Sequence, residues 1–211
     1  MSRTVLSFDE LNNLGIERRS MEFEQYFGEM DITPRQRDRR ISLAEDLEEE
    51  FLDFFAGFIT MEDEISDEQL RKNLRERIND SLPDDVRKTD NTDDMVKAIA
   101  DSIADTTKKR IDDPFTLSEY RAKENAEDVS NTFWNDYDYD EAVRQRKKFK
   151  MWHTIMDGRE RPAHNAADGQ MVDVLDPFVV GDELMMYPKD TSLGASLPNI
   201  IGCRCSVEYV G

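Results

Sequence analysis

The sequence predicts an α+β protein, with a mostly helical N-terminal body over residues 1–140 and a small C-terminal module of short antiparallel strands over residues 141–211. Two observations predict this division. In the first part, apolar residues recur at spacings of three and four, which is typical of amphipathic helices. From Lys148 onward the period changes to two, and most of the glycine and proline lies beyond Trp152 together with both cysteines.

Helix starts in the first part are marked by hydroxyl residues that stand three positions before a Glu or Gln. In such a capping box, each side chain accepts a hydrogen bond from the other residue's backbone amide. Boxes of this kind are Ser7–Glu10, Thr33–Gln36, Ser66–Gln69 and Thr116–Glu119.

The expected helices follow these starts. The apolar stripe that ends at Phe58 predicts that the helix from Thr33 is the longest in the protein, and Gly15 is a weak point in the helix before it. Asp112, Asp113 and Pro114 are expected to stop the fourth helix. In chain order, the helices are predicted at 8–27, from 33 through the stripe, at 67–79, around Met95 to Ile103, and from 117 to about 134.

Three short strands are expected in the C-terminal module, within the segments FKMWHTI, ELMMY and SVEYV. Turns between them are predicted at Asp157-Gly158, Arg161-Pro162 and Asp168-Gly169, because Gly, Pro and Asp favour turn conformations.

The composition limits the classes of function. A formal net charge of -19 argues against a chain that tracks a nucleic-acid backbone along its whole length, since each phosphate contact needs a Lys or Arg. The acidic surface is either simply solvated or docks on a basic partner ring. No apolar run approaches the roughly 18 residues of a membrane span, and no signal-peptide core is visible, so we expect no membrane partner and a cytoplasmic site of synthesis.

One basic cluster follows the helical body. It consists of Arg144, Arg146, Lys147, Lys148 and Lys150. Either the cluster is a solvated surface that compensates the negative charge of the preceding Asp-rich run, or it contacts DNA or an acidic partner surface.

The cysteines and a histidine suggest a zinc site. Cys203 and Cys205 would share one face of a strand, because alternate residues lie on the same side. With His164 and either Asp157 or His153, they could provide four zinc ligands. The alternative is that these side chains pack and form hydrogen bonds without a metal. A Cys-x-Cys disulfide would be strained, so we expect both thiols to be reduced.

Two further interpretations use the loop around Asp157. An ion pair between Asp157 and Arg161 could join two loops of the module. Alternatively, His164 and Asp157 could serve a metal-dependent nuclease or phosphodiesterase as a base and a metal ligand. Three features argue against catalysis. The chain has only two histidines, the residues around the candidate site are acidic, and the sequence lacks a glycine-rich phosphate loop.

One ordered set of residues runs through the module. It consists of Lys150, Trp152, Thr154, Asp157, Arg161, His164, Gly169, Asp176-Pro177-Phe178, Tyr187-Pro188 and Cys203-Arg204-Cys205. This set resembles the Mu protein F-like family of phage head-morphogenesis proteins. The preceding helix, with Arg121 and Glu124, is similar to the family's lead-in.

This resemblance implies a structural role in place of an enzymatic one. It implies a minor capsid protein that binds the portal protein, the major capsid protein or the scaffold during procapsid assembly and DNA packaging, with packaged DNA as a further partner of the basic cluster. It also implies a location in the virion, inside the capsid near the portal, after assembly in the host cytoplasm. Trp152, Asp157, Arg161 and His164 would form the structural motif of the module.

Overall fold

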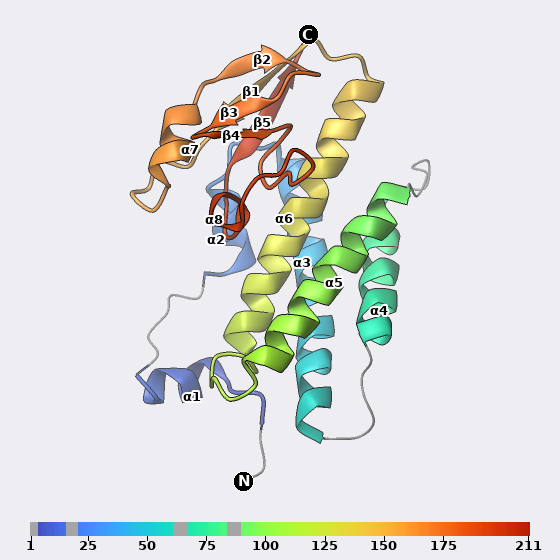
Figure 1. The fold of residues 1–211 in the computed structure, drawn as a ribbon, viewed down its shortest axis with the longest axis vertical. Coiled ribbons are helices and arrows are strands. Elements are labelled where there is room, and N and C mark those ends of the chain that lie inside the picture. The colour runs from blue at the N-terminus through green and yellow to red at the C-terminus, as the bar shows by residue number, and fades with distance from the viewer. Residues whose placement is uncertain (1–3, 16–20, 61–66, 84–89) are drawn as a thin grey trace. The chain divides into compact units, whose positions relative to one another are not determined.

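The structure is a computed structural model that describes residues 4–15, 21–60, 67–83 and 90–211 (Figure 1). It confirms the predicted α+β class. The described residues form the helices α1 (Phe8–Asn13), α2 (Phe23–Gly28), α3 (Pro34–Thr60), α4 (Asp67–Ser81), α5 (Asp90–Lys109), α6 (Glu119–Arg144), α7 (Pro162–Ala167) and α8 (Leu197–Ile200). The strands are β1 (Phe149–His153), β2 (Met171–Asp173), β3 (Phe178–Val180), β4 (Glu183–Met185) and β5 (Ser206–Val210).

The chain forms two compact units. The first comprises residues 1–21 and 42–127, and the second comprises residues 22–41 and 128–211. The helices α3 and α6 contribute residues to both units. The functional division expected at residue 140, between a docking body and a head-morphogenesis module, stays a prediction.

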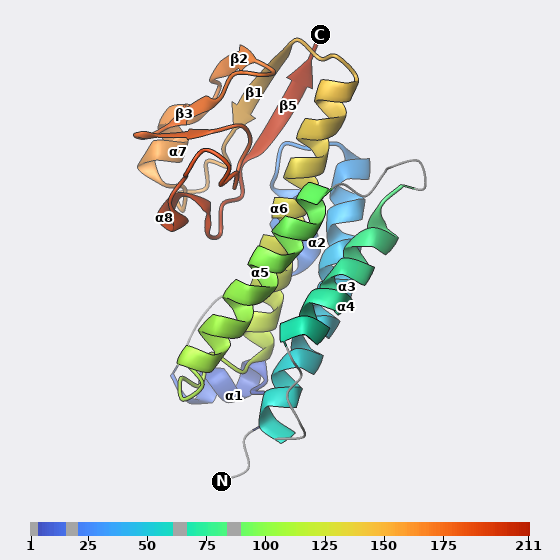
Figure 2. The ribbon, with the colours of Figure 1, turned by 45° about the vertical axis from the view of Figure 1, so that its right-hand side comes forward.

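The first unit is built from helices that bury one apolar stripe each. On α3 the stripe contains Leu47, Phe51 and Phe55, which are fully buried as the spacing predicts. Figures 1 and 2 show α4 and α5 side by side. Ion pairs between these two helices follow an antiparallel order: Asp67 with Lys108, Arg71 with Asp101, and Arg75 with Asp93.

Residues near the N-terminus are joined to the start of α6. The Leu6 amide donates to the Leu117 carbonyl at 2.9 Å, and the Glu119 amide donates to the Leu6 carbonyl at the same distance. The Glu119 carboxylate also accepts from the Phe8 amide at 3.1 Å. A buried guanidinium on α6, that of Arg121, donates to the Thr107 hydroxyl and to the Thr116 carbonyl, both at 2.8 Å. This burial lowers the pKa of Arg121 to about 10.

Two of the four predicted capping boxes are confirmed. Ser7 and Glu10 exchange hydrogen bonds at the start of α1, and Thr33 and Gln36 do so at the start of α3. Ser66 lies outside the described residues. The box at Thr116 is wrong, because the Ser118 hydroxyl accepts from the Arg121 amide at 3.2 Å and caps α6 in its place.

The predicted first helix is wrong, since two short helices, α1 and α2, replace it. Gly15 adopts a φ of 76°, the left-handed conformation that ends a helix. Glu22, directly before α2, is extended, with φ -65° and ψ 151°. The second predicted helix corresponds to α3. As expected, it is the longest helix among the described residues, with 27 residues against 26 for α6.

The fifth helix continues ten residues beyond the expected end at Trp134, to Arg144. The segment after Trp134 is rich in Asn and Asp, whose side chains can bond to nearby backbone groups and so disfavour a helix interior. Here Asn135, Asp136 and Asp138 bond to other segments instead, so they leave the helical backbone intact.

Two small antiparallel sheets form the C-terminal part of the second unit. The first has the strand order β2-β1-β5, with Trp152 opposite Val207, and the second pairs β3 with β4. The three predicted strands are present, but β2 and β3 were missed. Each has three residues, which is too short to display a period of two.

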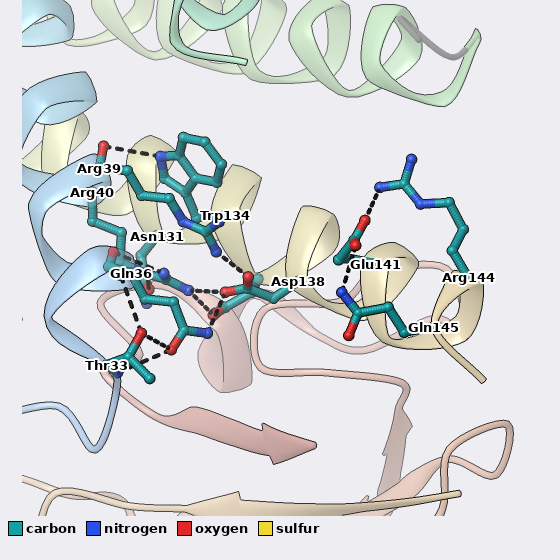
Figure 3. Close-up of polar contacts among 11 residues, drawn as sticks. Thr33, Gln36, Arg39, Arg40, Asn131, Trp134, Asp138, Glu141, Arg144 and Gln145 are labelled. Atoms are coloured by element: carbon teal, nitrogen blue, oxygen red, sulfur yellow. Dashed lines mark hydrogen bonds and ion pairs between the residues drawn. The ribbon is translucent and has the colours of Figure 1, made fainter. Parts of the chain in front are cut away.

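A buried polar network joins the first turns of α3 to α6 within the second unit (Figure 3). Arg40 is only 1% exposed and donates to Asp138 at 3.0 Å, to Asn135 at 3.0 Å and to Asn131 at 3.3 Å. Arg39 forms a second ion pair with Asp138, and its guanidinium lies 4.1 Å from the centre of a Trp134 ring. Asp138 therefore compensates two arginines, one of them fully desolvated.

We predict that Asp138→Ala destabilises the protein by about 3–5 kcal/mol, because it leaves the buried Arg40 charge without its carboxylate. Urea unfolding followed by tryptophan fluorescence measures the change. Glu141→Ala is the matched control, since it removes an exposed partner of Arg144 on the same helix and should cost less than about 1 kcal/mol. Equal losses in the two variants would contradict the argument.

A buried carboxyl on α6 predicts a pH dependence. The Tyr187 hydroxyl donates to Asp136 at 2.5 Å, and burial raises the pKa of Asp136 to about 6. The folded state thus binds this proton more tightly than the unfolded chain, whose Asp pKa is about 4. This group contributes stability that is present below about pH 4 and is lost as the pH rises through about 6.

The variant Asp136→Asn should remove this dependence, because the amide stays neutral and can still accept from Tyr187. Its stability relative to the wild type should rise by up to about 3 kcal/mol between about pH 4 and pH 8. Urea unfolding of both proteins across this range tests the prediction. A constant difference at all pH values would refute it.

Candidate functional site

A buried cluster of one histidine and two cysteines lies in the second unit. The donor atoms of His164, Cys203 and Cys205 all lie within 4.8 Å of one another. The Nδ1 atom of His164 lies 3.3 Å from Sγ of Cys205 and 3.5 Å from Sγ of Cys203. All three side chains are at most 3% exposed. The sequence predicts these three residues as zinc ligands together with Asp157 or His153, and neither of these two belongs to the cluster.

His164 reaches the cluster because a short helix begins just before it. Pro162 occupies the first turn of α7, where its missing amide hydrogen leaves no acceptor unpaired. The predicted turn at Arg161-Pro162 is therefore a helix start. The Thr154 hydroxyl donates to the His164 carbonyl at 2.8 Å, and the Thr154 amide donates to Asp168 at 2.8 Å. The middle of α7 and the residue that follows it are thereby joined to the segment after β1.

Trp152 packs against the histidine and closes the core of the module. Its ring meets the rings of His164 and Phe178 edge to face, with centroid distances of 5.9 Å and 5.3 Å. Its Nε1–H donates to the Thr154 hydroxyl at 3.0 Å, so the buried indole has its polar partner. The same hydroxyl lies 3.5 Å from Sγ of Cys205. Trp152 and Thr154 therefore form one wall of the cluster.

The two cysteines were expected on a strand, but they lie in the segment directly before β5. Side chains of α6 hold that segment. Asn131 donates to the Cys203 carbonyl at 3.1 Å. Asp128 accepts from the Gly202 amide at 2.9 Å and forms an ion pair with the buried Lys189. Lys189 in turn donates to the Ile200 carbonyl at 3.1 Å.

Sequence reasoning missed Asp128, Asn131 and Lys189. The available signal was the polar residues Asp128 and Asn131 in the middle of a helix, where such side chains are unfavourable unless they have partners elsewhere.

The buried environment shifts the pKa values of the two cysteines in opposite directions. The hydrogen bond from Cys205, supported by His164, lowers the pKa of Cys203 well below its usual range. The same hydrogen bond and burial raise the pKa of Cys205. Neither cysteine forms a disulfide.

Asp157 lies apart from this cluster, in a network of ion pairs. Its carboxylate accepts from Arg204 at 2.6 Å and from Nε of Arg159 at 2.7 Å, and both arginines also pair with Glu29. These hydrogen bonds outweigh desolvation and hold its pKa well below the usual value. The predicted pair of Asp157 with Arg161 is wrong, because Arg161 donates to the Ile201 carbonyl.

The other histidine also lies outside the cluster. His153 faces away from Trp152 on β1, with ring nitrogens 3.4 Å from Asp31 and from Glu208.

The structure divides the predicted basic cluster. Lys150 is fully buried, donates to the Met186 carbonyl at 2.6 Å and lies 4.9 Å from the ring centres of Tyr139 and Phe178. Burial lowers its pKa to about 8. Lys150 is thus part of the core, whereas Arg144, Arg146 and Lys148 are exposed and Lys147 is half-buried.

A small pocket opens beside the cysteines. Besides the three cluster residues, its lining includes Thr154, Glu160, Arg161 and Arg204. The cluster is therefore buried but adjoins a polar opening, and its donor atoms could bind a metal ion with one further ligand.

Comparison with known families identifies one match. A family model described as Phage Mu protein F like protein matches residues 66–208. This match confirms the resemblance carried by the motif from Lys150 to Cys205. Comparisons with curated proteins and with solved structures find no match. No described helix combines the length and the apolar composition that a membrane span requires.

We predict that Thr154→Val destabilises the protein by about 1–3 kcal/mol, because it keeps the side-chain shape but leaves the buried Trp152 N–H without its acceptor. Thr154→Ser retains the hydroxyl and is the control, with an expected loss below about 1 kcal/mol. Urea unfolding measures both changes. A valine variant as stable as the serine variant would contradict this role.

Proposed function

The chain belongs to the phage Mu protein F like family of phage head-morphogenesis proteins, and on this premise we propose that it is a minor capsid protein that binds the portal or the inner capsid wall during procapsid assembly and DNA packaging. The match over residues 66–208 carries this proposal, because it includes most of both compact units. A single structural role for both units is the simplest reading of such a match.

Exposed carboxylates on α3 support docking of the helical body to a basic partner. Glu45, Glu49 and Asp53 are all exposed and stand four residues apart, so they lie along one side of the helix. The formal net charge of -19 strengthens the attraction to a basic ring on the portal. Such binding should weaken as salt screens the charges.

The exposed part of the basic cluster supports a second contact. Arg144, Arg146, Lys147 and Lys148 follow one another closely at the end of α6 and before β1. We propose that they contact packaged DNA or an acidic surface of the capsid or scaffold. Lys150 has no part in this contact, because it is buried.

The nuclease alternative is not favoured. The family is one of structural phage proteins. In addition, the two residues that the alternative needs are separated: His164 lies in the buried cluster, and Asp157 is engaged by Arg159 and Arg204.

The proposal predicts that the chain co-purifies with the portal protein of the same phage, and that salt weakens the complex. A triple variant should reduce portal binding at low salt by about tenfold or more, because three attractive charges become repulsive. It combines Glu45→Lys, Glu49→Lys and Asp53→Lys. Pull-down from cells that produce all the head proteins, followed by titration of the purified components, measures the effect.

In a control variant, Lys replaces Glu24, Asp173 and Asp182, which are exposed residues of the second unit. This variant has the same net charge as the α3 variant. It should retain binding to within about threefold. Wild-type protein that co-purifies with neither portal nor capsid would refute the proposed function. Equal losses in the two charge variants would refute the role assigned to α3.

A further inference from the structure

The His164, Cys203 and Cys205 cluster has the donor types and the spacing of a zinc site. Thiolate sulfur and imidazole nitrogen are the ligands that Zn²⁺ prefers in proteins, in tetrahedral geometry. With usual zinc–sulfur and zinc–nitrogen bonds, a tetrahedral site separates such donors by about 3.6 Å. The observed distances from His164 Nδ1 to the two sulfurs are 3.3 Å and 3.5 Å.

Both sulfurs approach the same ring nitrogen of His164 at nearly equal distances. A neutral imidazole carries at most one proton on Nδ1, so it can donate to only one sulfur at a time. Its other nitrogen, Nε2, is buried and lacks a hydrogen-bond partner among the described residues. A metal ion would instead use the Nδ1 lone pair and both sulfurs at once.

We propose that the protein binds one Zn²⁺ ion through His164 Nδ1 and the thiolates of Cys203 and Cys205, with a water molecule as the fourth ligand. The adjoining pocket supplies the place for that water, since the cluster residues form part of its lining. Glu160 also lines this pocket, but its carboxylate accepts from the Gly158 amide at 2.7 Å. Zinc coordinates the thiolate form of cysteine, so binding displaces to solvent the protons that the two sulfurs still carry in the metal-free protein.

The site stabilises the module by joining two distant segments. His164 lies on α7, and the cysteines lie directly before β5, some forty residues later in the chain. The two sheets of the module have three and two strands, and the apolar core beside them is small. Units of this size often depend on a metal, and the free energy of zinc binding then adds to the free energy of folding. This inference stands independently of the proposed binding to the portal.

The first test is the metal content of the full-length chain, purified under reducing conditions without chelator. We expect about one zinc per chain, and a chelator that removes it should lower the thermal unfolding temperature. Replacement by Co²⁺ should produce the intense visible absorption and the thiolate charge-transfer band of tetrahedral cobalt. Wild-type protein with well under one zinc per chain, free thiols and no cobalt absorption after reconstitution would overturn the proposal.

Variants assign the ligands. Cys203→Ser and Cys205→Ser should each weaken cobalt binding at least about tenfold and reduce the charge-transfer band, with far-UV circular dichroism as the check of folding. His153→Gln is the matched control and should leave the cobalt spectrum unchanged, because His153 lies outside the cluster. Glu160→Gln should also leave it unchanged, and an altered spectrum there would overturn the assignment of water as the fourth ligand.

Discussion

The second unit depends on a row of buried and partly buried polar side chains along α6 that bond to other segments. Asp128, Asn131 and Asn135 bond to the backbone or side chains of residues before β5 and after β4, while Asp138 pairs with Arg39 and Arg40 of α3. Such groups are costly to bury unless every partner is in place. The helix therefore admits one arrangement of these segments.

This row explains how two cysteines far from the histidine in sequence come to face it. Asn131 and Asp128 hold the backbone of residues 202–203, and Thr154 holds α7 from the opposite side. Trp152 fills the space between them and bonds to the same threonine. The cluster is thus supported by hydrogen bonds from three separate elements, as expected for a site whose geometry must be maintained.

The motif residues divide into those that form the cluster and those that maintain its surroundings. Lys150 is a buried cation beneath two aromatic rings, and Asp157 organises two arginines at the surface. Arg121, from the helix before the module, bonds to the loop that leads into α6. Their shared feature is that each charged group bonds to partners within its own unit.

The sequence by itself determined the class of fold, the long stripe of α3, the strands β1, β4 and β5, and the grouping of His164 with the two cysteines. Periodicity and local capping are short-range signals, so they can be read from neighbouring residues. The tertiary structure decided the break at Gly15, the continuation of α6 past Asn135, the burial of Lys150 and the partners of Asp157. In each case except Gly15, the outcome depends on a polar group finding a partner far along the chain. Glycine can adopt both helical and left-handed backbone conformations, and Gly15 adopts the left-handed one.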